Sequence, residues 1–228
     1  MRTAAALLFA CLCPVVAAVA AGAQPARTFV YRAWATGSIR ETWVYTRIRG
    51  TSACVRTTRS AGSRVVRFRT ATPARIRLTG AARPQLPARL IPTQITSIEG
   101  TLRHRPGSAT TTSTCGPKKV VVCEATAARF DHALLRVAMR KDRKLVLGRI
   151  RHSLLAGPLR GCGTVVYPRT GDVDLVEGKA IPTRLLGRGT IEVEATYTST
   201  TPLGGRGFAS GLLVTNVDWD LRLVRTGR

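Results

Sequence analysis

Apolar and polar residues alternate in segment after segment of this 228-residue chain. The alternation is clearest in residues 66–69, 75–78, 135–140, 191–198 and 216–223. Because successive side chains of a strand point to opposite faces, this pattern predicts strands with one buried and one solvated face. No segment carries a sustained amphipathic helical period. The sequence therefore predicts an all-β protein, an antiparallel β-sandwich or distorted barrel that is disulfide-bonded.

The breaks between these segments carry Gly, Pro, Ser and Asp, which are typical of turns. We expect two strands within residues 27–45, separated near Gly37, and a loop over residues 106–119, which are rich in Ser and Thr. Hairpin turns are expected at 141–144 and at 201–207.

The first 23 residues have the three parts of a secretory signal peptide. Arg2 supplies a positive charge, residues 4–20 are an apolar run, and Ala21 and Ala23 form a small-x-small cleavage site. We therefore expect cleavage after Ala23 and a secreted or extracytoplasmic protein associated with the cell envelope. Two alternatives remain open, an uncleaved membrane anchor and a lipoprotein modified at Cys11.

The mature chain, residues 24–228, is long enough to bury a core of its own. We expect it to form one β-sandwich domain. The alternative is a pair of small β subdomains that meet near residue 125.

Four cysteines lie beyond the leader, and an even number in an exported chain predicts two disulfides. They allow three pairings. We favour Cys115 with Cys123, which closes a short loop, and therefore Cys54 with Cys162. A zinc site is disfavoured, because the spacing of Cys115 and Cys123 is not that of a zinc knuckle and no histidine is near.

The chain is strongly basic, with a formal net charge of +24 and 31 Arg against 5 Lys. Residues 24–120 carry 18 basic and 2 acidic residues, so the imbalance is greatest in the first half. A field of this size attracts polyanions. The alternative is compositional, because a GC-rich genome encodes Arg-rich and Ala-rich chains and the excess runs through most of the sequence.

Four arginines form the sharpest candidate for a binding site. If residues 65–70 and 74–79 pair as a hairpin across Thr70–Ala74, their arginines share one face. Guanidinium groups suit phosphate and carboxylate, so we predict an anion-binding site here. The alternative is a solvated face on which a Glu from another strand neutralises the charge. The predicted anion-binding residues are Arg67, Arg69, Arg75 and Arg77.

The expected partner is an anionic envelope polymer, a membrane surface or another protein. Nucleic acid is disfavoured, because the compartment lacks genomic DNA and Phe and Tyr are too scarce for a base-stacking platform. Trp34 and Trp43 are candidates for stacking on sugar rings, with core packing favoured for both. Trp219 alternates with apolar residues and is expected in the core. The sequence does not indicate an oligomeric state.

The inventory for enzyme chemistry is thin, so we expect a non-enzymatic protein without catalytic residues, cofactor or metal. The alternative is a secreted hydrolase. Glu192 and Glu194 would lie on one strand face, about 7 Å apart by strand rise, which suits a glycosidase-like carboxylate pair. Asp172, Asp174 and Glu177 could hold calcium, although they lack the ligand order of an EF-hand.

Overall fold

The computed structural model describes residues 26–80, 86–90, 94–148, 178–205 and 207–227. The predicted signal peptide (1–23), Cys162 and the candidate calcium loop (172–177) lie outside these residues. Within the described ranges, no helix is long and apolar enough to cross a membrane. The described residues also include a short 3₁₀ helix, η2 (Thr183–Leu185). The strands are β1 (Thr28–Thr51), β2 (Cys54–Thr70), β3 (Ala74–Thr79), β4 (Arg89–Leu90), β5 (Gln94–Ser113), β6 (Gly116–Val122), β7 (Thr126–Met139), β8 (Lys144–Gly148), β9 (Lys179–Ala180), β10 (Thr190–Pro202) and β11 (Ser210–Gly227).

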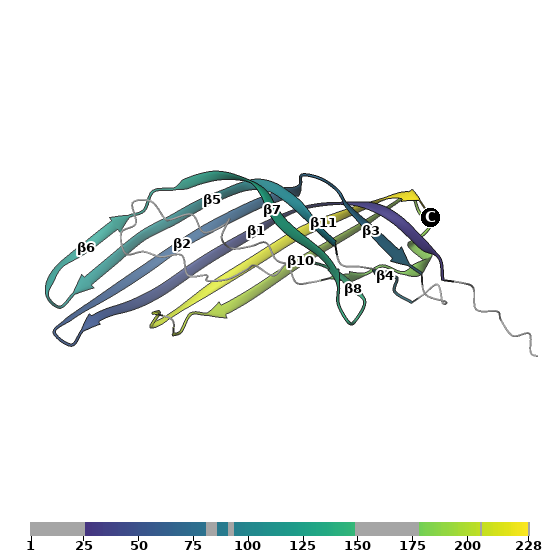
Figure 1. Ribbon diagram of the computed structural model, residues 1–228. Helices are drawn as coiled ribbons and strands as arrows, with labels where there is room; N and C mark the ends of the chain where they lie inside the picture. Colours follow the sequence, from purple (N-terminus) through teal and green to yellow (C-terminus); the bar gives the residue numbers. More distant parts are fainter. Residues whose placement is uncertain (1–25, 81–85, 91–93, 149–177, 206, 228) are drawn as a thin grey trace, which may run out of the picture.

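All described strands belong to one antiparallel sheet of eleven strands, with the order β10-β11-β1-β2-β5-β7-β8-β9. β3 pairs with β1 and β4, and β6 pairs with β5. The sheet is long, twisted and strongly curved, and it does not close into a barrel (Figure 1). The predicted class, all-β, antiparallel and disulfide-bonded, is confirmed. The bounds of the mature domain stay a prediction.

β1 is the central strand, and it runs without a break through Gly37. The expected division of this segment into two strands is wrong. Gly37 is needed for packing, because a Cβ there would lie 2.6 Å from the ring of Phe68 and 2.7 Å from the carbonyl oxygen of Asp218. The glycine therefore admits Phe68 to the core instead of making a turn.

The Ser/Thr-rich segment 106–119 is also mostly strand and not a loop. β5 extends to Ser113, and after a tight turn β6 returns along it from Gly116. Threonine favours extended backbone, which explains the error. The two predicted hairpin turns are confirmed. Residues 140–143 join β7 to β8. The connection from β10 to β11 begins after Pro202, so Thr201 and Pro202 of the predicted segment still belong to β10.

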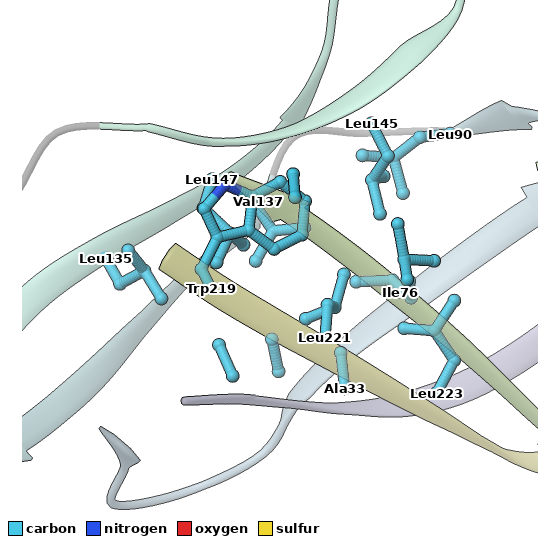
Figure 2. Packing of buried hydrophobic residues seen from close by; sticks show 14 of the residues in the cluster. Ala33, Ile76, Leu90, Leu135, Val137, Leu145, Leu147, Trp219, Leu221 and Leu223 are labelled. Carbon is cyan, nitrogen blue, oxygen red and sulfur yellow. The ribbon is translucent and has the colours of Figure 1, made fainter. Parts of the chain in front are cut away.

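The core lies on the concave face of the sheet, where β7 and β8 fold over β1, β3 and β11 (Figure 2). Trp219 sits at its centre and is 2 % exposed. Burial of each large side chain contributes roughly 1.5–3 kcal/mol to folding. This packing therefore holds β7 and β8 against β1, β3 and β11. The side chains labelled in Figure 2 are Ala33, Ile76, Leu90, Leu135, Val137, Leu145, Leu147, Trp219, Leu221 and Leu223.

The observed disulfide joins Cys54 to Cys115, with their Cα atoms 5.4 Å apart. Both predicted pairings, Cys115 with Cys123 and Cys54 with Cys162, are therefore wrong. The strand register explains the result. Arg56 of β2 lies opposite Ser113 of β5, so the two cysteines meet where β2 begins and β5 ends. Cys123 is disulfide-bonded as well, and Cys162 lies outside the described residues.

Candidate functional site

The four predicted arginines do not lie on a hairpin. β2 and β3 do not pair with each other; both pair with β1, one after the other along the same edge. The segment Thr70–Ala74 therefore carries the chain onward without reversing it. Its backbone is tied to β5 instead, where the Ala71 amide donates to the Ser97 carbonyl oxygen and the Thr96 hydroxyl donates to the Thr72 carbonyl oxygen.

The four side chains nevertheless share one face, because each lies opposite an outward-facing residue of β1. This face is the convex side of the sheet, opposite the core. β1, β5 and β7 place further exposed arginines on this side, and the eight that are named at the end of this paragraph are together called the arginine face. In register, Ser38 lies opposite Arg67, Thr36 opposite Arg69, Arg32 opposite Arg75 and Val30 opposite Arg77. The arginine face comprises Arg32, Arg40, Arg67, Arg69, Arg75, Arg77, Arg103 and Arg129.

One member of the arginine face is neutralised as the alternative interpretation expected. Arg69 makes an ion pair with Glu99 on β5, with 2.6 Å between Nη2 and Oε1. The Arg69 side chain is 72 % exposed and that of Glu99 is 38 % exposed, so the pair is a surface contact. Glu99 and Arg69 also line a hollow of about 590 Å³ together with Arg129 and Asp131, so charges of both signs meet there.

The other seven arginines of this face make no ion pair with any carboxylate in the described part of the chain. Arg32 and Arg75 are direct partners on adjacent strands. Like charges in this position destabilise a sheet unless an anion lies between them. The face is therefore electropositive and poorly compensated.

The carboxylates of the hydrolase alternative lie on the same convex side, at the β10 edge. Glu192 and Glu194 line an open hollow of about 620 Å³ with Asp220, Arg222 and Trp34. Glu194 lies opposite Asp220, and Glu192 lies opposite Arg222, with 4.0 Å between Glu192 Oε1 and Arg222 Nε. The structure thus brings the two predicted carboxylates together with a third carboxylate and an aromatic side chain.

The three tryptophans have different positions. Trp43 and Trp219 are each 2 % exposed and belong to the core. Trp34 points to the convex face, where it is half-buried, so the expected core position is wrong for this residue. It is the tryptophan that could stack on a ligand.

Sequence reasoning missed a row of buried polar residues on the concave face. Glu41 and Arg64 are fully buried direct partners, and Arg64 Nε donates to Glu41 Oε2 at 2.9 Å. Thr215 lies beside Glu41, and His104 lies beside Arg64, at 2 % and 3 % exposure. The signal was present, because Glu41 falls at an inward position between Ile39 and Trp43.

No metal centre is found in the part of the chain that the structure describes, where no three His, Cys, Asp or Glu side chains gather. The candidate calcium ligands lie outside that part.

No known protein family, no curated protein and no solved structure matches this chain.

Proposed function

We propose that this chain is an exported, non-enzymatic protein that binds an anionic polymer of the cell envelope along its arginine face. The observation that carries the proposal is the row of exposed arginines on one side of β1, β2 and β3, where Arg32 faces Arg75 without a carboxylate between them. An anionic chain lying across the row would offset that repulsion.

The dimensions of the face suit an extended polymer. Its arginines follow β1 from the position of Val30 to Arg40, which are ten residues apart. At about 3.3 Å per residue this row is about 33 Å long. Guanidinium groups bind phosphate and carboxylate through paired N–H donors, so a polymer with regularly spaced anionic groups can contact several arginines at once.

The experiment compares the mature chain, residues 24–228, with a variant in which Arg67, Arg69, Arg75 and Arg77 are all changed to Gln. Binding to purified envelope fractions and to polyphosphate is measured at low and near-physiological salt. We expect the variant to bind about 10- to 100-fold more weakly at low salt and to show a flatter salt dependence, because fewer counterions are released.

The matched control removes four positive charges elsewhere, as Lys118→Gln, Lys119→Gln, Arg184→Gln and Arg188→Gln. All four are exposed and lie outside the arginine face. The proposal requires the control to keep most of the affinity. Equal losses in both variants would mean that only net charge matters, and the arginine face would then be wrong as a site.

A secreted hydrolase is the second candidate, and it is favoured by the hollow that holds Glu192, Glu194 and Trp34. An aromatic side chain beside carboxylates suits a sugar ring with hydroxyl groups. Incubation of the mature chain with envelope polysaccharide distinguishes the two candidates. Release of reducing ends that is lost in Glu192→Gln or Glu194→Gln would support the hydrolase, whereas we expect no release.

A further inference from the structure

A second basic site lies at one end of the sheet, on the concave side. The β1–β2 turn and the β5–β6 turn lie side by side there and are joined by the Cys54–Cys115 disulfide (Figure 1). A hollow of about 370 Å³ opens beside them. Among the residues that the structure describes, no acidic residue lines it. Its lining is Arg47, Arg49, Gly50, Thr51, Cys54, Arg56, Thr58 and Thr111, and we call it the tip pocket.

Arg47 is held in place as a built part of this pocket. Arg47 is 7 % exposed, and its Nε donates to the Gly207 carbonyl oxygen at 3.2 Å. Its guanidinium lies over the Phe208 ring, 5.6 Å from the centroid. Phe208 is in turn fixed edge-on against Tyr45, with ring centroids 5.0 Å apart. The loop between β10 and β11 thus fixes the guanidinium before any ligand arrives.

The terminal nitrogens of Arg47 make no hydrogen bond and no ion pair with the described residues. Burial lowers the pKa of the Arg47 guanidinium, and the adjacent charge of Arg49 lowers it further. Both effects raise the free energy of the charged side chain. An anion in the tip pocket would relieve both, because it replaces lost solvation and screens the two positive charges from each other.

Two further arginines face the same hollow from adjacent strands. Arg49 and Arg56 are direct partners in the β1–β2 pairing and both are exposed. Like charges placed opposite each other weaken a strand pair, so this arrangement also calls for an anion. The hydroxyls of Thr58 and Thr111 are hydrogen-bonded to each other at 3.0 Å, which leaves one hydroxyl hydrogen of the pair to donate to an oxyanion.

We propose that the tip pocket binds a phosphate monoester group through Arg47, Arg49 and Arg56. Three guanidinium groups supply charge-assisted donors from more than one direction, which matches the several oxygens of a tetrahedral dianion better than the two of a carboxylate. The volume of about 370 Å³ leaves room for the group that carries the phosphate.

This site is distinct from the arginine face. Arg47, Arg49 and Arg56 lie on the concave side of the sheet, whereas Arg67 and its neighbours lie on the convex side. The tip pocket therefore goes beyond polymer binding, and a variant of one site leaves the other intact. Failure of one proposal can be told from failure of the other.

In the test, the oxidised mature chain is titrated with inorganic phosphate and with glycerol 3-phosphate. Binding is measured by calorimetry at constant ionic strength. A separate arm uses vesicles of neutral lipid with and without phosphatidic acid. We expect saturable binding of at least one phosphate source. The double variant Arg49→Gln, Arg56→Gln should weaken phosphate binding at least tenfold, because it removes two charge-assisted donors. Both positions are exposed, so we expect the variant to fold.

The matched control is Arg184→Gln, Arg188→Gln, which removes the same charge at exposed positions near η2. It should bind phosphate like the unmodified chain. If the Arg49→Gln, Arg56→Gln variant loses binding only to the vesicles, the phosphate belongs to a lipid headgroup. If it loses binding to the soluble compounds, the phosphate belongs to a free or polymer-borne ester. Binding that is equal in both double variants, or that chloride reproduces at the same ionic strength, would overturn the proposal.

Discussion

The buried pair of Glu41 and Arg64 is the most constraining contact at the scale of single residues. Both side chains have no exposure, and they join the neighbouring strands β1 and β2. A buried ion pair adds little net stability, because desolvation offsets most of the attraction between the charges. Its main effect is on register, since a slip of one residue in either strand would move one charge to the other face and leave its partner buried alone.

Removal of one partner should therefore be costly. We expect Glu41→Gln to lower the free energy of unfolding by about 3 kcal/mol, because the charge of Arg64 stays buried with weaker compensation. The double variant Glu41→Leu, Arg64→Met should lose less than Glu41→Leu alone, since no charge is left in the core. Urea denaturation measures these three variants together with Arg64→Met alone, which completes the double-mutant cycle. Additive losses in the double variant would show that the two residues contribute independently.

The sequence indicated which residues face inward but not how their polar groups are satisfied. The alternation around Ile39 and Trp43 places Glu41 inside, and the same rule places Arg64 inside beside Val66. Recognition of the pair requires the register of β1 against β2, which a single strand pattern does not contain. The half-buried position of Trp34 likewise follows from its alternation with Ala33 and Ala35, whereas the prediction of a core position rests on residue type alone.

At the scale of elements, strand patterns were predictable and strand partners were not. Residues 65–70 and 74–79 were correctly expected as strands, yet they follow each other along β1 instead of pairing. A short turn-like linker such as Thr70–Ala74 is compatible with both arrangements, and the choice depends on hydrogen bonds to the distant β5. The predicted cysteine pairing was wrong for the same reason, because it depends on which strands are partners.

The Cys54–Cys115 disulfide makes a clear prediction at this scale. It closes a loop with a sequence separation of 61, for which the chain-entropy estimate is about 4 kcal/mol. We expect the double variant Cys54→Ser, Cys115→Ser to lose stability of this order in urea denaturation. Peptide mapping of the oxidised chain should recover Cys54 linked to Cys115, and recovery of Cys115 linked to Cys123 would contradict the register described above.

At the scale of the whole molecule, the convex face joins two regions of opposite charge. Acidic residues gather on β10 and β11, around Glu194 and Asp220, although the entire chain holds only 12 acidic residues. The arginine face lies on β1, β2, β3 and β5. A uniform compositional bias toward Arg explains the arginine face, but it does not explain why the few acidic residues gather on β10 and β11. The separation therefore favours a face that is arranged for binding.

Such a face carries a stability cost that can be measured in the absence of a ligand. The variant with Arg67, Arg69, Arg75 and Arg77 changed to Gln removes the repulsion between Arg75 and Arg32, while it loses only a surface ion pair at Arg69. We expect its free energy of unfolding to rise by about 0.5 kcal/mol at low salt. The gain should vanish near 1 M salt, where the screening length is about 3 Å.

The four-charge control at Lys118, Lys119, Arg184 and Arg188 should gain less, because its residues are spread over separate elements. Urea denaturation at both salt concentrations provides the comparison. If the arginine-face variant is instead less stable at both, its arginines hold the sheet together, and their exposure on one face is structural. A gain confined to low salt would show that the chain keeps a repulsive surface that its own fold does not need, which is the expected property of a surface completed by an anionic partner.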